Sequence, residues 1–176
     1  MTITPDTKDW TWVLERPCPE CGFNTRGFAV TAVPGMIMAN VAAWQAALDR
    51  AGDARARPAP DKWSAVEYGC HVRDVFRLYD QRLELMLSQD DPLFPNWDQD
   101  ASAVANRYAD QDPAEVAAAL SEAGQAIAGR FAGVTGDQWQ RTGRRSDGAS
   151  FTVETFARYF IHDPVHHLYD VTGQRR

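Results

Sequence analysis

Apolar residues recur at helical spacing in four stretches of the chain, and no stretch shows the strict alternation expected of a half-buried strand. The first stretch runs from about residue 34 to residue 50, and the second from about residue 65 to residue 89. In both, apolar side chains return every three or four positions, which places them on one face of a helix. The first face comprises Ile37, Val41, Trp44 and Leu48, and the second comprises Val72, Val75, Tyr79, Leu83 and Met86.

Start and stop signals support these helices and predict two more. Ser64, followed three residues later by Glu67, is the pattern of a capping box at the start of the second helix. Asp112 followed by Pro113 is a typical start for a third helix. Its buried stripe comprises Val116, Leu120, Ala123, Ile127 and Phe131. A fourth helix is predicted from about Thr152 to Thr172, before Gly173.

Long connections separate the predicted helices. The stretch from about residue 90 to 110 is long enough to cross the molecule, and residues 133–150 are rich in turn formers. The sequence therefore predicts an all-α protein, a four-helix bundle with crossover connections over residues 34–176. Residues 1–33 are predicted to be an irregular N-terminal extension that carries a Cys-x-x-Cys turn and docks on the bundle.

Composition and charge restrict the class of partner. The chain has 176 residues, of which 44% are hydrophobic and 24% charged, as in a soluble globular domain. It has no apolar run of the roughly 18–20 residues that span a bilayer. The net charge of −6 argues against nucleic acid or an anionic membrane as a partner. The polar N-terminus is unlike a signal peptide, so we expect a cytoplasmic protein.

The histidines are the main candidates for chemistry. His162 and His166 lie about 40° apart on one face of the fourth helix, which suits two ligands of one metal ion. His71, near the start of the second helix, lies at the edge of its buried stripe and could complete a three-histidine site. His167 points about 100° away from His166 and is not expected to share that ion. The alternative is that buried histidines only hydrogen-bond within the core.

Three imidazoles would leave coordination positions open to water or a thiol, whose pKa the ion would lower. Nitrogen ligands suit Zn, Ni, Fe or Cu better than Mg or Ca. Asp170 follows His166 by four residues, and Asp74 follows His71 by three, so each could orient an imidazole. Both aspartates are equally well explained as surface residues.

The run from His162 to His166 is similar to the His-Glu-x-x-His motif of zinc proteases, but Asp163 replaces the glutamate and Pro164 follows it. The shorter side chain and the proline, which removes a helix hydrogen bond, both work against peptidase geometry. We therefore exclude a protease.

Three segments carry a resemblance to a known family. Residues 63–74, residues 158–171 and the turn at 147–153 resemble the DinB-like superfamily of metal-binding four-helix bundles, which is related to bacillithiol- and mycothiol-dependent transferases. The resemblance covers about residues 34–173. It implies that His71, His162 and His166 bind one divalent metal ion, and that the protein forms a homodimer. It also implies that a low-molecular-weight thiol is a co-substrate in some relatives.

The extension contains a second candidate. Cys18 and Cys21, with Gly22 after them, form half of a zinc-ribbon knuckle, and the chain has no second Cys-x-x-Cys pair to complete it. Three interpretations stay open: a reduced turn, a redox or disulfide pair, and a metal shared with another group. Cys70 is better explained as a core residue.

These observations favour a metal-dependent enzyme that activates a low-molecular-weight thiol or water for attack on a small electrophilic substrate. The predicted cofactor is one divalent transition metal, Zn or Ni, and the activity that the resemblance implies is thiol S-transfer. Arg73, Arg77 or Arg158 could hold an acidic substrate, or could be surface charges. The alternatives are a non-catalytic metal-binding module with a stress-response or regulatory role, and a bundle with purely structural histidines.

Overall fold

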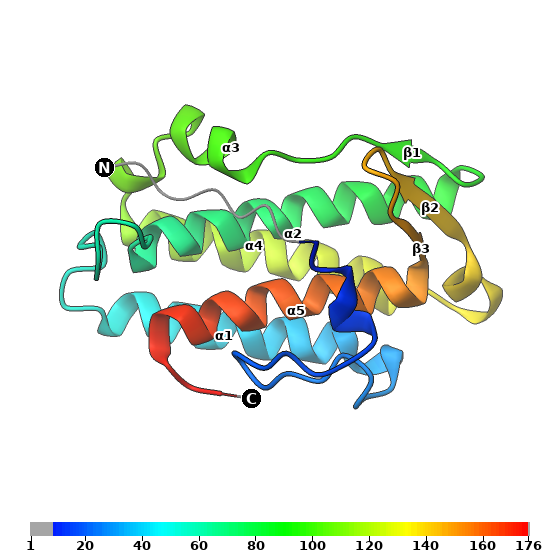
Figure 1. Ribbon diagram of the computed structural model, residues 1–176, viewed down its shortest axis with the longest axis horizontal. Coiled ribbons are helices and arrows are strands. Elements are labelled where there is room, and N and C mark those ends of the chain that lie inside the picture. Colours follow the sequence, from blue (N-terminus) through cyan, green and yellow to red (C-terminus); the bar gives the residue numbers. More distant parts are fainter. Residues whose placement is uncertain (1–8, 176) are drawn as a thin grey trace.

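The protein is a bundle of four long helices. The computed structural model describes residues 9–175. The helices are α1 (Val33–Arg50), α2 (Ala65–Ser88), α4 (Pro113–Ala132) and α5 (Val153–Thr172) (Figure 1). The predicted four-helix bundle is confirmed, and each helix begins and ends within a residue or two of its expected bounds.

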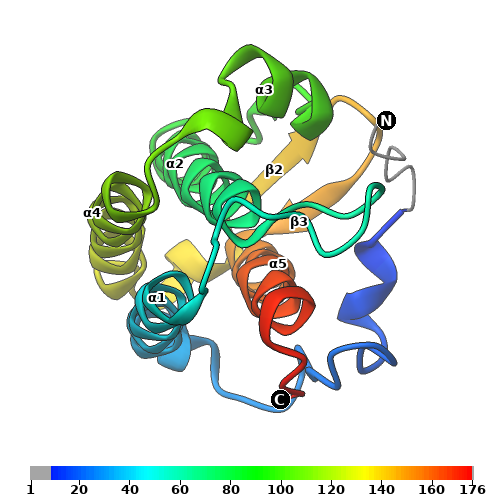
Figure 2. The ribbon, with the colours of Figure 1, turned by 90° about the vertical axis from the view of Figure 1, so that its left-hand side faces the viewer.

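The helices do not pack in chain order. α4 packs against α1 and α2 on one side of the bundle, and α5 packs against the same two helices on the other side (Figure 2). α1 and α5 run in one direction along the bundle, whereas α2 and α4 run in the other (Figure 1). Because α2 and α4 are neighbours that run the same way, the chain must return along the whole bundle between them.

This return is the long connection predicted from the sequence. It contains β1 (Leu93–Phe94), the short helix α3 (Gln99–Ala105) and the 3-10 turn η3 (Tyr108–Asp110). The Asp98 side chain accepts a hydrogen bond from Ala101 N and caps α3. The connection passes over α2 and delivers the chain to the end of the bundle where α4 begins (Figure 1).

A small sheet corrects the expectation that the chain contains no strand. β1 pairs in parallel with β2 (Thr142–Arg145), which pairs antiparallel with β3 (Ser150–Thr152). The register places Phe94 opposite Arg145 and Gly143 opposite Phe151. Strands of two to four residues are too short for alternation to be visible in the sequence. The sheet closes the end of the bundle where α5 begins.

The apolar faces predicted for the four helices meet in one core. Trp44, Phe76, Phe131 and Phe160 are among its fully buried side chains. α4 approaches α1 closely at Gly124, where an added Cβ would lie 2.3 Å from a methyl group of Val41. Cys70 is also fully buried in this core, as expected.

The capping box at the start of α2 is present. Glu67 N donates to Ser64 Oγ at 3.3 Å, and Ser64 N donates to Glu67 Oε2 at 2.8 Å. Arg57 forms two further hydrogen bonds to the buried carboxylate of Glu67. The linker before α2 is therefore attached to the helix that it precedes.

The described part of the N-terminal extension lies along the outer side of α5 (Figure 1). It contains the 3-10 turns η1 (Thr11–Leu14) and η2 (Val30–Ala32); a further turn, η4 (Gly136–Gln140), follows α4. Arg158 of α5 donates from Nη1 to the carbonyls of Thr25 and Phe28. Residues 1–8 of the predicted extension, including the polar N-terminus, and Arg176 lie outside the described residues.

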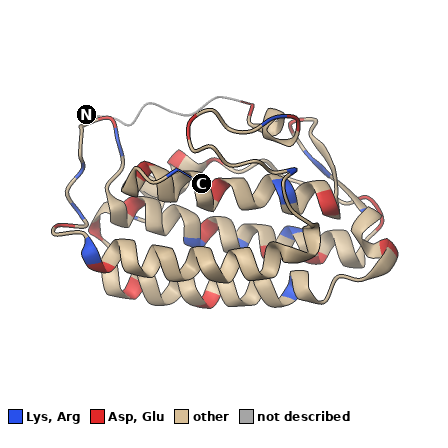
Figure 3. Ribbon diagram, turned by 90° about the horizontal axis from the view of Figure 1, so that it is seen from below, with Lys and Arg blue, Asp and Glu red and all other residues tan. Residues whose placement is uncertain are grey.

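Charged residues of both signs are interspersed along the described chain (Figure 3). Between residues 9 and 175 no helix combines the length and hydropathy needed to cross a bilayer.

Candidate metal centres on the last helix

α5 carries two overlapping pairs of potential metal ligands. His162 and His166 form one pair, and Asp163 and His167 form the other. Within each pair the side chains are four residues apart and share a helix face, but the two pairs are offset by one residue and so by about 100°. The first pair faces the N-terminal extension, where the cysteines lie, and the second faces His71 of α2.

The group formed by His71, Asp163 and His167 joins α2 to α5. One potential ligand atom from each residue lies within 4.8 Å of the others. His71 Nε2 lies 3.3 Å from Asp163 Oδ1, and His167 Nε2 lies 3.9 Å from Asp163 Oδ2. The Asp163 carboxylate therefore lies between two imidazoles.

His71 is completely buried, and within the described residues neither of its ring nitrogens has a hydrogen-bond partner. Asp163 Oδ1 is also buried without a hydrogen bond. Unpaired buried polar atoms are costly, so atoms that face one another in this way require an explanation. A shared cation would satisfy both of them.

Neighbouring side chains hold the rings of this group. Asp170 Oδ2 lies 2.8 Å from His167 Nδ1, which directs Nε2 of the same ring toward Asp163. The Trp97 ring stacks on His71 with centroids 5.3 Å apart, and Tyr68 stacks on His167 at 5.1 Å. A carboxylate behind a histidine and an aromatic shell around it are usual features of metal sites.

The electrostatics keep both carboxylates ionised. Burial by itself would raise the pKa of Asp163, but the adjacent His71 and His167 outweigh it, and the net shift is strongly downward. Burial likewise opposes ionisation of Asp170, but its hydrogen bond with His167 lowers the pKa below the usual value. Asp163 is therefore an anionic donor at neutral pH.

A second group joins the N-terminal extension to α5. Cys18, Cys21, His162 and His166 are all buried, and their potential ligand atoms lie within 4.8 Å of one another. Cys18 Sγ lies 3.6 Å from His166 Nδ1, and Cys21 Sγ lies 3.8 Å from His162 Nε2. The three cysteines of the chain are free thiols.

Burial governs the protonation of this second group. It raises the pKa of Cys21 to about 12 and lowers that of His162 to about 4, the latter with a smaller contribution from His166. The pKa of His166 is lowered by burial and by the nearby His167. Both imidazoles are thus neutral at pH 7, which leaves each with a lone pair.

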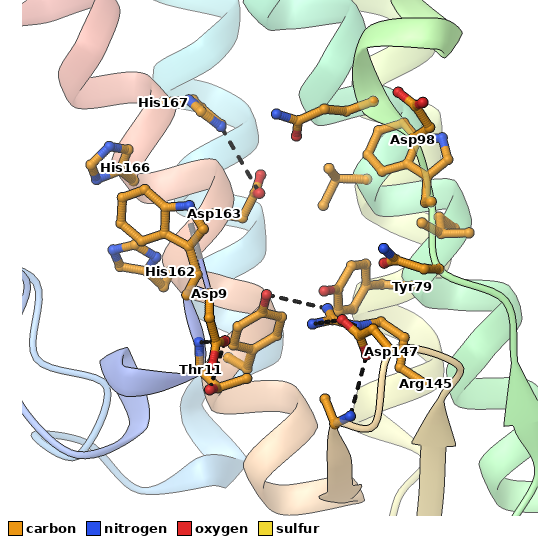
Figure 4. Close-up of a pocket in the computed structure, with 18 of the residues that line it drawn as sticks. Asp9, Thr11, Tyr79, Asp98, Arg145, Asp147, His162, Asp163, His166 and His167 are labelled. Atoms are coloured by element: carbon orange, nitrogen blue, oxygen red, sulfur yellow. Dashed lines mark hydrogen bonds and ion pairs between the residues drawn. The ribbon is translucent and has the colours of Figure 1, made fainter. Parts of the chain in front are cut away.

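A cavity of about 1200 Å³ lies beside both groups (Figure 4). Figure 4 shows His162, Asp163, His166 and His167 along one wall. Asp9, Trp10, Thr11 and Glu20 of the N-terminal extension contribute to the lining, as do residues of α2 and of the crossover. The cavity is therefore bounded by the bundle, the crossover and the extension.

Two arginines and two tyrosines lie at the end of the cavity nearer the sheet: Arg82, Arg145, Tyr79 and Tyr159. Arg145 is paired with Asp147 at 2.8 Å and donates to the Tyr159 hydroxyl at 3.3 Å. Arg82 is 4% exposed and donates to Pro95 O at 2.7 Å. Among residues 9–175 no carboxylate lies within ion-pair distance of Arg82, so its charge is available to a bound anion.

The sequence-predicted ligands thus fall into two groups. His162 and His166 lie together as expected, but they lie with Cys18 and Cys21, whereas His71 lies with Asp163 and His167. The physical reason is that α2 and the extension contact adjacent faces of α5. The sequence analysis did not assign His167 to the metal ion, and it considered Asp163 only as the residue that replaces the catalytic glutamate of zinc proteases. The signal for a second pair of ligands was present in the sequence, because Asp163 and His167 are also four residues apart, one position after His162 and His166.

The two residues predicted to orient the imidazoles, Asp74 and Asp170, have other nearest partners in the structure. Asp74 accepts hydrogen bonds from Arg73 and from the Tyr108 hydroxyl at 2.6 Å, and not from His71. Asp170 contacts His167 at 2.8 Å more closely than His166 at 3.8 Å. The arginines considered as substrate-binding residues, Arg73, Arg77 and Arg158, do not line the cavity. Arg82 and Arg145 line it instead.

Fold and site together define a class: four-helix bundles whose last helix presents metal-ligand side chains to a cavity. The family model of the DinB superfamily matches residues 37–171, and the chain belongs to this superfamily. The resemblance found in the sequence is therefore confirmed.

A similar solved structure is that of YfiT from Bacillus subtilis, described as "a probable metal-dependent hydrolase with an unusual four-helix bundle topology". The TM-score is 0.77 and the identity 17%, over 84% of this chain and 88% of YfiT. At this identity the likeness establishes the fold. Comparison with curated proteins gives no match.

Proposed function

We propose that this protein is a metal-dependent enzyme whose catalytic ion is held by His71, Asp163 and His167. The observation that carries the proposal is the burial of His71 beside a large cavity, where its ring nitrogens make no hydrogen bond among the described residues and Nε2 lies 3.3 Å from the anionic Asp163. A purely structural histidine in such a place would normally have a hydrogen-bond partner.

The donor set suits a catalytic ion. Two imidazoles and one carboxylate are the protein ligands of several catalytic zinc sites, in which a further position is open to water or substrate. When bound, such an ion lowers the pKa of a water or thiol beside it and polarises an electrophile. Zn or Ni remains the metal that we propose, now with one oxygen and two nitrogen donors.

The surrounding residues position the ligands and the substrate. Asp170 holds the His167 ring by its Nδ1 edge, and Trp97 and Tyr68 restrict the two imidazoles. Arg82 offers an unpaired positive charge at the other end of the cavity, with Tyr79 beneath its guanidinium at 5.5 Å. We therefore propose a small electrophilic substrate with an acidic group.

The size of the cavity favours a reaction with two reactants. Sites for one drug-sized ligand are roughly 300–1000 Å³, and this cavity is about 1200 Å³. It has room for a low-molecular-weight thiol beside the electrophile, which supports thiol S-transfer. Water as the nucleophile is the second candidate, favoured by the similarity to YfiT, whose description names a hydrolase.

Metal analysis of variants tests the proposal. Asp163→Asn and His71→Ala should each lose one equivalent of metal and all turnover in a screen of thiols and esters. Asp110→Asn, a surface control paired with Arg107, should lose neither. If His71→Ala and His162→Ala instead remove the same equivalent, the three-histidine set of the sequence prediction is right and the set proposed here is not. Retention of metal and turnover in Asp163→Asn would also exclude it.

Two further expectations belong with this function. A homodimer is what the resemblance implies, and sedimentation velocity tests it, with a stable monomer as the contrary result. A cytoplasmic location stays a prediction, which fractionation of the source cells would check.

A further inference from the structure

We propose a second metal site, a structural zinc ion bound by Cys18, Cys21, His162 and His166. This site is separate from the proposed catalytic centre and does not depend on it. Its four donors come from two parts of the chain more than 140 residues apart, as the separations of 141 and 148 residues within its two cysteine–histidine pairs indicate.

The spacing of the donors matches a tetrahedral ion. With Zn–S about 2.3 Å and Zn–N about 2.0–2.1 Å, a sulfur and a nitrogen ligand of one tetrahedron lie roughly 3.6 Å apart. The Cys18–His166 and Cys21–His162 pairs lie at 3.6 and 3.8 Å. The same distances specify which atoms bind, namely Nδ1 of His166 and Nε2 of His162.

The backbone around the cysteines has the form of a zinc knuckle. Gly22 N donates to Cys18 O at 2.9 Å, and Cys18 N donates to Phe23 O at 2.9 Å. Gly22 adopts a φ of 80°, which a residue with a side chain rarely adopts. This turn directs both thiols to the same side. His162 and His166 of α5 supply the two further ligands that a second Cys-x-x-Cys pair provides in a zinc ribbon.

The charge and burial of the group also fit zinc. All four residues are at least 94% buried, with exposures of 1%, 0%, 5% and 6% for Cys18, Cys21, His162 and His166. Two thiolates and two neutral imidazoles balance one Zn²⁺. Binding forms two Zn–S and two Zn–N bonds and releases the two thiol protons to solvent. With four protein ligands, the site has no position for substrate and is therefore structural.

The surroundings orient the ligands and show what the ion would do. His166 Nε2, the nitrogen turned away from Cys18, lies 3.6 Å from Glu20 Oε2. The Trp10 ring packs on both histidines, with centroids 5.6 Å from His162 and 5.1 Å from His166. Trp10 and Glu20 also line the cavity. The zinc ion therefore fastens the N-terminal extension to α5 and fixes that wall of the cavity.

Cobalt substitution of the full-length protein, purified with a reductant, tests the site. We expect the near-ultraviolet charge-transfer band of a cobalt–thiolate bond and the visible bands of tetrahedral cobalt, both abolished by zinc. Asp163→Asn and Cys70→Ala should keep the charge-transfer band, and the double variant Cys18→Ser/Cys21→Ser should lose it. The wild-type spectrum alone can confirm or exclude a cobalt–thiolate bond, so the test remains valid if a cysteine variant does not fold. A wild-type protein without the band overturns the proposal, as does a band that persists in the double variant Cys18→Ser/Cys21→Ser.

Limited proteolysis tests the structural role. Trypsin should cleave after the exposed Arg26 at least tenfold faster in Cys21→Ser than in the wild type, while Asp163→Asn should resemble the wild type. Equal cleavage rates in Cys21→Ser and the wild type would mean that no ion fastens the extension. Cys21→Ser and Asp163→Asn alter different groups of ligands. A negative result in this experiment therefore excludes the structural zinc site without excluding the proposed catalytic centre, which the metal analysis tests separately.

Discussion

His166 and His167 are consecutive in the chain, yet their imidazoles belong to different groups. Their ring centroids lie 5.6 Å apart and their planes are inclined by 82°. His166 faces Cys18 of the extension, whereas His167 faces Asp163 toward α2. One turn of α5 thus supplies ligands both to the proposed catalytic ion and to the proposed structural ion.

Asp170→Asn should weaken the proposed catalytic centre without removing a ligand. The carboxylate holds His167 Nδ1 at 2.8 Å, and loss of such a partner typically costs about 10–100-fold in metal affinity. Competition with a chelator of known affinity would measure the change. The cobalt–thiolate band should persist, and Asp110→Asn is the surface control. Unchanged affinity would show that Asp170 does not position His167.

Arg82→Gln should weaken the binding of acidic molecules in the cavity. A charge-assisted hydrogen bond contributes about 1.5–3 kcal/mol, so the affinity for a carboxylate probe such as succinate should fall about 10–100-fold. Tryptophan fluorescence would report binding, since Trp10, Trp63 and Trp97 line the cavity. Arg144→Gln, at an exposed pair with Asp91, is the control. Equal affinity in both variants would exclude Arg82 as the anion-binding residue.

The Glu67 carboxylate should make stability depend on pH. Burial opposes its ionisation, but hydrogen bonds from Arg57 and Ser64 outweigh burial and lower the pKa below the value in the unfolded chain. Its contribution is therefore complete above the unfolded pKa of about 4.5 and is lost as the pH falls through the folded pKa. Glu67→Gln should cost about 1.5–3 kcal/mol at pH 7. Urea unfolding between pH 7 and pH 3 should show the difference between the two proteins shrinking; a constant difference would contradict the assignment.

Two glycines of α4 provide a matched test of packing. At Gly124 an added methyl group would lie 2.3 Å from Val41 Cγ2 and 3.1 Å from Phe76 Cε2, whereas at Gly129 it would meet nothing within 4 Å. Gly124→Ala should therefore destabilise the protein by about 1–3 kcal/mol. Gly129→Ala should stabilise it by about 0.5–1 kcal/mol, because alanine favours the helix. Thermal unfolding of the two variants would measure both effects, and a stabilised Gly124→Ala would contradict the close contact of α4 with α1.

The helices were predictable because each contains local sequence signals that specify it. The periodic apolar face of α1, the Ser64–Glu67 box of α2 and the Asp112–Pro113 start of α4 are local features, readable without knowledge of the fold. The small sheet was not predictable, because β1 lies beside β2 only through the path of the crossover.

The candidate site was predictable in its residue types but not in its grouping. The sequence indicated that His162 and His166 share a face and that Cys18 and Cys21 needed further ligands. It could not indicate that the extension covers that face, because only tertiary packing brings Cys21 within 3.8 Å of His162. For the same reason the sequence could not indicate that His71 lies beside Asp163 and His167, and metal analysis of the variants decides between this set and the three-histidine set.

The two ligand pairs of α5 overlap within six consecutive residues, 162–167. Inserting a single residue between Asp163 and His166, or deleting Pro164 or Val165, would rotate everything after it by about 100° and break both pairs at once. Substitutions can alter one group and spare the other, but changes of length between Asp163 and His166 cannot. During the divergence of related chains, this segment should therefore keep its length wherever both groups are retained, even where the loops around it vary.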